Sequence, residues 1–479
     1  MSGTLRDYQI ADLAFYMQTP RCLNTSDPGT GKTPSVCAYS WYLWSELQHR
    51  TVWSMPKSLL KKNMDELLLF SGFKPEDIAI VDGTPKQRKK AIESDAKVFL
   101  IGFTAFSNEW EALLDAHPDI NAVLVDELHM GYGGHNSQRT QNLYAAMEKI
   151  KYFVGMTGTI INGRLSSAYP CIQLIEPSRY RGGYHHFMAR HALEDNYGRV
   201  IAWTHPELLK PFFYKFAIRH TFEEVYGPEA KVIIPEKCQM DPRQREAYDE
   251  FEETALLELE ENWLDGSFSS AVHLIKCRQI MEHPQTLGAP LDQIKTTGKE
   301  DRLIIHLEDV KQSGKPIIVF AALVHQIERA AEIAKKMGLR VGVIHGGVPT
   351  KKRFEIDEKF RAGELDVVIA SPATTAVGYN WGHVDTMVFM SLDYMDSSFV
   401  QGYRRAIRGV RGKPLLIYIL QYEDCSVEDR IIEIVERKSK LASDVDDTKE
   451  KITLRAEKPK KAKAKSEAPP LGFKMADIL

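Results

Sequence analysis

The stretch CLNTSDPGTGKT, residues 22–33, combines the residue types that bind the phosphates of a nucleotide. Gly29 and Gly31 allow backbone N–H groups to turn inward around phosphate oxygens, because glycine adopts backbone conformations that other residues avoid. Lys32 adds a positive charge for the β- and γ-phosphates, and the hydroxyl of Thr33 can bind Mg²⁺. The stretch follows a strand-like run and precedes a helical pattern, which is the context that a phosphate-binding loop requires.

A second element strengthens this interpretation. The strict pattern GxxxxGK[ST] has glycine where this chain has Ser26, which leaves open a tight strand–helix turn with a solvated lysine. The run AVLVDELHM, residues 122–130, is an apolar strand that ends in Asp126 and Glu127. A phosphate loop needs one acid to hold Mg²⁺ and another to polarise the attacking water, and these two acids fit those roles in that order. Two solvated acids that cap a strand are the alternative.

Two parts of the chain alternate strand-like runs with helical patterns, which predicts α/β domains with parallel sheets. Six such runs lie between residues 20 and 160, and five lie between 315 and 420. The segment between these parts is mostly helical, and its longest pattern, PRQREAYDEFEETALLELEENWL, predicts a charged amphipathic helix. The predicted organisation is a first lobe over 1–165, a helical segment and linker over 166–300, a second lobe over 301–440, and a Lys-rich disordered tail over 441–479.

Composition limits the function classes. The 479 residues have a net charge of −3, so any binding to nucleic acid must use local patches. The six cysteines form no CxxC pair, which argues against a zinc site and fits a reducing compartment. We find no signal peptide pattern and no apolar run of membrane-spanning length, and therefore expect a cytoplasmic protein with no membrane partner.

Taken together, these motifs resemble those of superfamily two helicases, with DELH in the place of the DEAD or DEAH box. The nearest resemblance is to the Swi/Snf branch of DNA-dependent ATPases, in which IKCRQIMEHP (275–284) is similar to LRQICNHP. LRDYQ (5–9) resembles the LRxYQ opening, which implies that Gln9 reads the adenine edge. MTGTIINGR (156–164) resembles the LTGTPxxN segment that couples the ATP state to DNA. The resemblance implies two tandem RecA-like domains and the cofactors ATP and Mg²⁺.

The second lobe carries its own motifs. IASPATTAVGYNW (369–381) resembles STKAGGLGINL, with Thr375 and Ala376 in place of two glycines. Further on, Gln401, Arg405 and Arg408 have the spacing QxxxRxxR. On a helix these three residues share one face, so the arginines would reach the γ-phosphate from across a cleft. The alternative is a solvated basic helix or a nucleic-acid patch. Arg404 lies off this face, where it is available to DNA.

The resemblance assigns roles residue by residue. The predicted catalytic residues are Lys32, Asp126, Glu127, Arg405 and Arg408, and the predicted metal ligands are Thr33 and Asp126. Nucleotide binding is assigned to Gln9, Gly29, Thr30, Gly31, Lys32, Thr33, Gly378 and Gln401. Contacts to DNA phosphates are assigned to Lys57, Ser58, Thr104, Gly346 and Ser371, and coupling to His129, Thr157 and Thr159.

The leading hypothesis is an ATP-driven motor on double-stranded DNA that serves replication, recombination or repair. One alternative is a strand-separating helicase, although the sequence shows no wedge. Another is an ATP-gated nucleic-acid clamp with weak turnover, which the intact catalytic residues disfavour. The few insertions suggest a compact viral or bacterial protein, in the host cytoplasm if viral. The apolar end LGFKMADIL is interpreted first as a frayed terminus, with a docking segment for a protein partner as the alternative.

Overall fold

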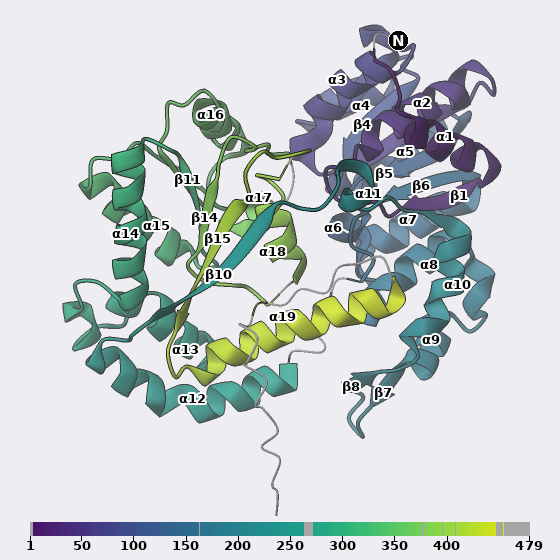
Figure 1. The fold of residues 1–479 in the computed structure, drawn as a ribbon. Coiled ribbons are helices and arrows are strands. Elements are labelled where there is room, and N and C mark those ends of the chain that lie inside the picture. The colour runs from purple at the N-terminus through teal and green to yellow at the C-terminus, as the bar shows by residue number, and fades with distance from the viewer. Residues whose placement is uncertain are drawn as a thin grey trace, which may run out of the picture.

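The computed structural model describes residues 3–161, 163–262, 272–375, 378–394, 396–407, 409–446 and 454. Two separate sheets form the centres of two lobes, which lie beside each other in Figure 1. The first lobe is drawn mainly in purple and blue, and the second mainly in green. The predicted α/β fold with two tandem parallel-sheet domains is confirmed.

The first sheet has seven strands in the order β3-β4-β2-β5-β6-β1-β9, and all neighbours pair in parallel. Its strands are β1 (Arg21–Asn24), β2 (Arg50–Met55), β3 (Ile78–Val81), β4 (Val98–Gly102), β5 (Ile120–Val125), β6 (Tyr152–Met156) and β9 (Ala217–Ile218). Its helices are α1 (Asp7–Gln18), α2 (Lys32–Ser45), α3 (Leu60–Phe70), α4 (Pro85–Ile92), α5 (Phe103–Ala116), α6 (Leu128–Tyr132) and α7 (Gln138–Lys149).

Successive residues of β5 enter two different buried layers. Ala122 and Leu124 belong to the layer that α1–α3 cover, whereas Val123 and Val125 belong to the layer under α5–α7. A strand turns alternate side chains to opposite faces, and a parallel sheet covered by helices buries both faces. The near-continuous apolar run in β5 therefore suits a position in the middle of the sheet. Asp126 and Glu127, which follow β5, lie at the carboxyl edge of the sheet.

The second sheet has the order β10-β15-β14-β11-β13-β12 and is also parallel throughout. Its strands are β10 (Lys231–Cys238), β11 (Ile317–Phe320), β12 (Val341–Ile344), β13 (Val367–Ala370), β14 (Thr386–Phe389) and β15 (Leu415–Tyr422). Its helices are α12 (Pro242–Asn262), α13 (Val272–Glu282), α14 (Gly298–Ser313), α15 (Val324–Lys336), α16 (Thr350–Arg361), α17 (Pro372–Thr375), α18 (Asp396–Tyr403) and α19 (Ser426–Val445).

The segment 166–300, predicted as mostly helical, also contributes strands to both sheets. Its helices include α8 (Tyr169–Ile175), α9 (Gly183–His191), α10 (Lys210–Phe216), α11 (Phe222–Tyr226) and the long α12. β9 pairs with β1 at an edge of the first sheet, and β10 pairs with β15 along its whole length. β9 is two residues long, and β10 contains Lys, Pro and Glu and is mostly half-buried. These two segments therefore form strands because a neighbouring strand lies beside each of them, and not because of their sequence pattern.

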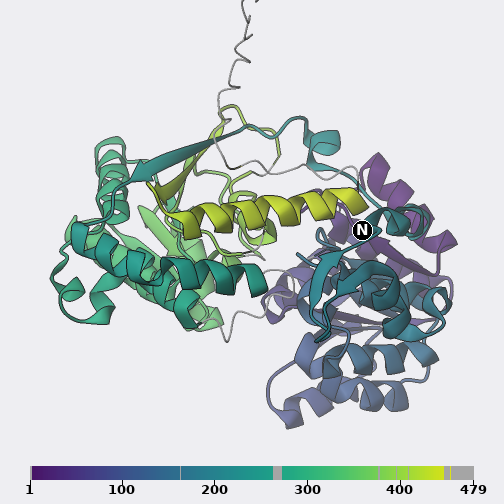
Figure 2. The ribbon, with the colours of Figure 1, turned by 90° about the horizontal axis from the view of Figure 1, so that it is seen from below.

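The long helix α19 joins the two lobes: it runs along their lower side in Figure 1 and faces the viewer in Figure 2. Ile431 and Val435 lie in the core of the second lobe, whereas Ala442 and Val445 are buried in a core of the first. The prediction that a disordered tail begins at 441 is therefore wrong for the residues up to Val445, because apolar spacing continues through them. The Lys-rich stretch itself lies outside the described residues, as does the apolar end. No helix within the described ranges is both long enough and apolar enough to cross a bilayer.

A buried ionic cluster holds α13, α14 and α19 together in the second lobe. The Lys299 ammonium, 1% exposed, lies 3.2 Å from Glu282 Oε1 and 2.7 Å from Glu428 Oε1. Two carboxylates share this one cation, and removing one partner of a buried ion pair leaves an uncompensated charge. The cluster is therefore a strong stability determinant.

We expect Lys299→Met to lower the free energy of unfolding by about 3–5 kcal/mol, because it leaves two like charges buried. Chemical denaturation followed by circular dichroism measures this loss. The matched control is Lys295→Met, at an exposed lysine near the start of the same helix, which should change stability by less than about 0.5 kcal/mol. Equal effects of the two variants would contradict a structural role for the cluster.

Candidate active site

The turn between β1 and α2 has the geometry of a phosphate-binding loop. Gly29 and Gly31 have φ values of 90° and 85°, in the left-handed region that favours glycine. Lys32 and Thr33 open α2, so the amide groups of the helix N-terminus face the space above the loop. The Lys32 ammonium donates hydrogen bonds to the carbonyl oxygens of Ser26 at 2.8 Å and Asp27 at 3.3 Å. Burial lowers the pKa of Lys32, while the carboxylates of the site oppose that shift.

Ser26 fits the loop without the glycine of the strict pattern. It is buried, its N–H donates to the side-chain oxygen of Asn24 at 3.1 Å, and its hydroxyl accepts from the N–H of His220 at 2.9 Å. A glycine would lack this last contact, which ties the loop to the segment after β9.

Gln9 braces the loop from α1. Its amide nitrogen donates to the Gly31 carbonyl at 2.8 Å, and its amide oxygen accepts from the Arg6 N–H at 2.9 Å. Next to it, the Tyr8 hydroxyl donates to the Thr30 carbonyl at 2.5 Å. The LRDYQ segment and the glycine-rich loop are therefore one unit, while adenine recognition by Gln9 stays a prediction.

The two acids after β5 lie in the same cleft as the loop. Asp126 is held by two hydrogen bonds, from the N–H of Glu127 at 3.0 Å and from the amide of Asn63 at 3.3 Å. Burial and then the Glu127 carboxylate raise the pKa of Asp126. Glu127 has a φ of 50°, a conformation that a non-glycine residue keeps only where its surroundings enforce it. A cation between Thr33 and Asp126 would relieve the crowded negative charge, so the donor set fits Mg²⁺.

His129 connects the acids to the segment after β6 within the first lobe, and the predicted link from Glu127 to the second lobe stays a prediction. One ring nitrogen lies 2.8 Å from the Thr157 hydroxyl and 3.6 Å from the Glu127 carboxylate. The Thr157 hydroxyl in turn donates to the Thr159 carbonyl at 2.9 Å. The three residues assigned to coupling thus form a single contact path, although their effect on turnover is untested. Asn162 of the same motif lies outside the described residues.

A cavity of about 580 Å³ separates the lobes at this point. From the first lobe it is lined by Gln9, Gly29, Gly31, Lys32, Thr33, Asp126 and Glu127. From the second lobe it is lined by Gly378, Tyr379, Asn380 and Arg405. Residues almost 400 positions apart in the chain therefore face one space that is large enough for a nucleotide.

Of the helical face predicted from Gln401, Arg405 and Arg408, only Arg405 lines the cavity among the described residues. α18 ends at Tyr403, so Arg405 lies in the turn that follows, where its Nε donates to the Gln401 carbonyl at 3.0 Å. Arg405 reaches the cavity, but the buried Gln401 is not among the residues that line it. The predicted helical face is therefore wrong for Gln401 and Arg405, because α18 ends before Arg405. Arg408 lies outside the described residues.

Arg404, predicted to be available for DNA, is instead buried between the lobes. Its guanidinium contacts the Asp27 carboxylate at 3.1 Å and the Glu229 carboxylate at 2.8 Å. A guanidinium enclosed by two carboxylates has no free donor face for a DNA phosphate, so this prediction is wrong.

The predicted DNA contacts all follow the carboxyl ends of parallel strands. Lys57 and Ser58 follow β2 and Thr104 follows β4, while Gly346 follows β12 and Ser371 follows β13. Strand ends of this kind share one edge of each sheet. Lys57, whose side chain is 62% exposed, pairs with Asp82 at 2.7 Å. These residues therefore lie at the carboxyl edges of the two sheets, and contact with DNA stays a prediction.

Arg6 and Tyr226 have no role in the sequence-based assignments, yet both line the cavity. The Arg6 guanidinium lies 5.3 Å from the centre of the Tyr226 ring and donates to its hydroxyl at 3.2 Å. The same hydroxyl donates to the Gly29 carbonyl at 3.3 Å. Arg6 belongs to the LRDYQ motif, which was a usable signal, whereas nothing around Tyr226 marks it in the sequence.

Comparison with known proteins identifies the family. The description "SNF2-related domain" matches residues 8–286, and "Helicase conserved C-terminal domain" matches residues 298–410. The chromatin remodeling factor mit1 of Schizosaccharomyces pombe is 22% identical over 474 residues, which cover 91% of this chain and 32% of that protein. The mouse chromodomain-helicase-DNA-binding protein 1-like is 22% identical over 454 residues, which cover 91% and 49%. The chain thus spans between a third and a half of these relatives.

Among solved structures, the Hef helicase domain of Pyrococcus furiosus has a TM-score of 0.51 and 15% sequence identity. The likeness covers 89% of this chain and 97% of that domain, and it agrees with the predicted pair of RecA-like domains. The first family description spans more than half of the chain and contains both the phosphate-binding loop and the paired acids. With these motifs facing one cavity, the chain belongs to the SNF2-related, Swi/Snf-type family of superfamily two helicase-like ATPases.

Proposed function

We propose that this protein hydrolyses ATP with Mg²⁺ and uses the energy to move along double-stranded DNA. The observation that carries the proposal is the interlobe cavity, which is lined by the loop and acids of one lobe and by Arg405 of the other. The similarity to a chromatin remodeling factor and to a chromodomain-helicase-DNA-binding protein supports DNA as the track.

The roles of the residues follow from charge and position. Lys32 would neutralise the β- and γ-phosphates, and Thr33 and Asp126 would hold Mg²⁺, which would stabilise charge that develops on the phosphates. Glu127 would orient and polarise the attacking water. Arg405 would meet the γ-phosphate from the second lobe, and a contact of this kind stabilises the transition state.

Movement follows if the cavity closes on ATP and opens after hydrolysis. The γ-phosphate attracts cationic groups from both lobes, and its loss removes that attraction. If both lobes hold DNA phosphates at their strand ends, each cycle shifts one lobe relative to the other. Contacts to phosphates carry no sequence information, as a motor that ignores sequence requires. Replication, recombination or repair is the process that we propose, with the cytoplasm, or the host cytoplasm, as its location.

A strand-separating helicase is the second candidate, because the structure contains a hairpin. β7 (Ala192–Glu194) and β8 (Val200–Trp203) form an antiparallel pair that projects from the first lobe in Figure 1. Tyr197 at its tip is 86% exposed, and aromatic side chains stack on unpaired bases. Such a hairpin could act as the wedge that separates the two strands of a DNA duplex.

One set of measurements separates these functions. We expect the rate of ATP hydrolysis to rise severalfold with duplex DNA, and to rise less with single-stranded DNA or RNA. We also expect ATP-dependent displacement of a triplex-forming strand from a duplex. Unwinding of a forked duplex without triplex displacement would favour the helicase. Equal rates with and without any nucleic acid would contradict a nucleic-acid motor.

A further inference from the structure

Buried ion pairs run between the lobes beside the phosphate-binding loop. Their side chains are between 8% and 15% exposed, so solvent and salt screen them little. The pairs form one chain in which positive and negative groups alternate. In order, its members are Lys231, Glu229, Arg404, Asp27, Arg219 and Asp446.

The centre of this ion chain is the carboxylate of Asp27, in the loop itself. Arg404 of the second lobe contacts one oxygen at 3.1 Å, and Arg219, just after β9, contacts the other at 3.0 Å. The N–H of Phe222 donates to it as well, at 3.1 Å. Burial alone would raise the pKa of Asp27, but the two guanidinium groups lower it far below its usual range. Asp27 is therefore a charged anchor that holds the loop from both sides.

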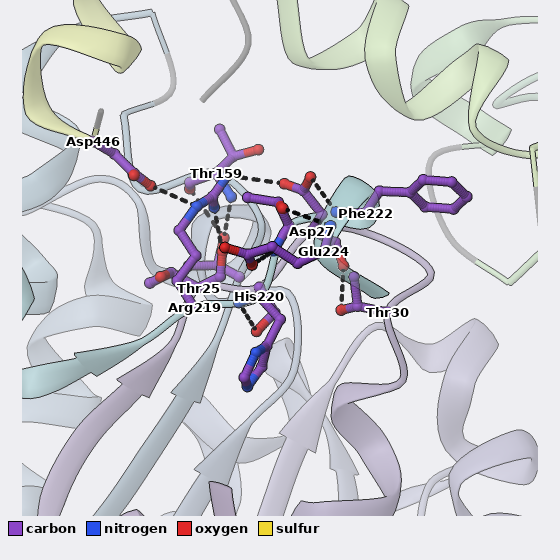
Figure 3. Close-up of polar contacts among 12 residues, drawn as sticks. Thr25, Asp27, Thr30, Thr159, Arg219, His220, Phe222, Glu224 and Asp446 are labelled. Atoms are coloured by element: carbon purple, nitrogen blue, oxygen red, sulfur yellow. Dashed lines mark hydrogen bonds and ion pairs between the residues drawn. The ribbon is translucent and has the colours of Figure 1, made fainter. Parts of the chain in front are cut away.

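The two ends of the ion chain lie in different parts of the fold. On one side, Glu229 accepts from Arg404 and from Lys231 of β10, which belongs to the second sheet. On the other side, Arg219 contacts Asp446 at 3.0 Å, at the end of α19. Figure 3 shows Arg219 between Asp446 and the loop residue Thr25, whose carbonyl it also contacts at 2.6 Å. The loop is thus linked to the second lobe and to the helix that joins both lobes.

The anchored carboxylate is tied to the catalytic groups through two short connections. The carbonyl of Asp27 accepts from the Lys32 ammonium, so a shift of Asp27 moves a partner of Lys32. Arg404 directly precedes Arg405, which lines the cavity. Docking Arg404 on the loop therefore places Arg405 opposite the nucleotide phosphates.

We propose that Arg404 is a positioning residue, and that the ion chain sets both the loop and Arg405 for nucleotide binding when the lobes approach. This inference rests on the proposed ATPase function and deepens it. The loop and Arg405 are then already ordered when ATP binds, so binding loses less conformational entropy and the apparent affinity for ATP rises. Loss of the contact should raise the KM for ATP more than it lowers kcat, because the groups that act on the phosphates remain.

The test is a double-mutant cycle of Arg404→Gln and Asp27→Asn in the full-length protein. We expect each single variant to raise the KM for ATP about tenfold, with kcat changed by less than about threefold. The double variant should raise the KM by much less than the product of the two single effects, because both variants remove the Arg404–Asp27 contact. The matched control is Arg411→Gln, since Arg411 is as buried as Arg404 but pairs with Asp385 inside the second lobe. The proposal would be overturned if the KM of the double variant rose by the product of the two single effects. It would also be overturned if the KM of Arg411→Gln rose as much as that of Arg404→Gln.

A second measurement reports lobe closure without hydrolysis or DNA. All six cysteines are buried, so cysteines introduced as Ala112→Cys on α5 and Lys336→Cys on α15 can be labelled selectively for energy transfer. Titration with a non-hydrolysable ATP analogue should close the lobes, and Arg404→Gln should require about tenfold more analogue. Identical titrations would contradict the positioning role, whereas a parent protein that neither binds the analogue nor hydrolyses ATP would contradict the proposed function itself.

Discussion

Lys32→Ala is expected to abolish ATP hydrolysis, with a loss of about 10³-fold or more in kcat/KM, while the lobes stay folded. The ammonium lies inside the loop, where it donates to the carbonyl oxygens of Ser26 and Asp27. Phosphoryl transfer depends mainly on positioning and charge neutralisation, and alanine removes both. Steady-state hydrolysis assays and binding of a labelled ATP analogue measure the effect.

The matched control for this prediction is Lys61→Ala. The side chain of Lys61 on α3 is 74% exposed. It forms an ion pair at 2.9 Å with Asp65, one turn along the same helix. Its removal should leave hydrolysis unchanged, because exposed ion pairs of this spacing contribute little. Circular dichroism of both variants shows whether the fold is retained. Hydrolysis by folded Lys32→Ala at the parent rate would show that the loop is only a structural turn.

The parts of the fold that the sequence predicts correctly are those whose pattern is local. The six runs of the first lobe and the five of the second become β1–β6 and β11–β15, because each run is apolar enough to pack against the helices that cover a parallel sheet. The order of Gly29, Gly31 and Lys32 likewise fixes a loop by backbone conformation alone. Such features need no information about distant residues.

The parts that it misses depend on partners far along the chain. β10 becomes a strand because β15 lies beside it, and nothing in KVIIPEKC requires this. Arg404 looks like a solvent-facing DNA contact until Asp27, 377 residues earlier, is seen to bind it. A charge pattern shows that a residue is cationic, but only the folded chain shows which anion it meets.

The same dependence on distant partners explains why the QxxxRxxR spacing predicts a helix that the structure does not continue. The spacing of Gln401 and Arg405 fits one helical face, yet α18 ends at Tyr403 and the chain turns. Arg404 is held by anions on both sides, and this tertiary contact favours the turn over another helical residue. Arg405 thus lies at the cavity as expected, although the turn that carries it was not predicted, and its contact with the γ-phosphate stays a prediction.

Glu127→Gln should separate nucleotide binding from hydrolysis. We expect kcat to fall by about 10²- to 10⁴-fold, because the amide has no basic oxygen to take a proton from water. ATP binding should persist, since Lys32 and Thr33 are intact and one negative charge near the phosphates has gone. Single-turnover hydrolysis and equilibrium binding of ATP measure the two quantities. The lobe-labelled protein should then stay closed on ATP for many times the parent cycle.

Asp126→Asn provides the contrast for this last prediction, because the two acids differ in what they hold. Asp126 is the buried member, fixed by Asn63 and assigned to Mg²⁺, so its loss should weaken binding of Mg²⁺–ATP as well as hydrolysis. Glu127 is fixed instead by its backbone conformation and its approach to His129. If Glu127→Gln lost ATP binding while Asp126→Asn kept it, the roles of the acids would be exchanged. Closure that survives without hydrolysis would instead identify the loss of the γ-phosphate as the event that opens the lobes.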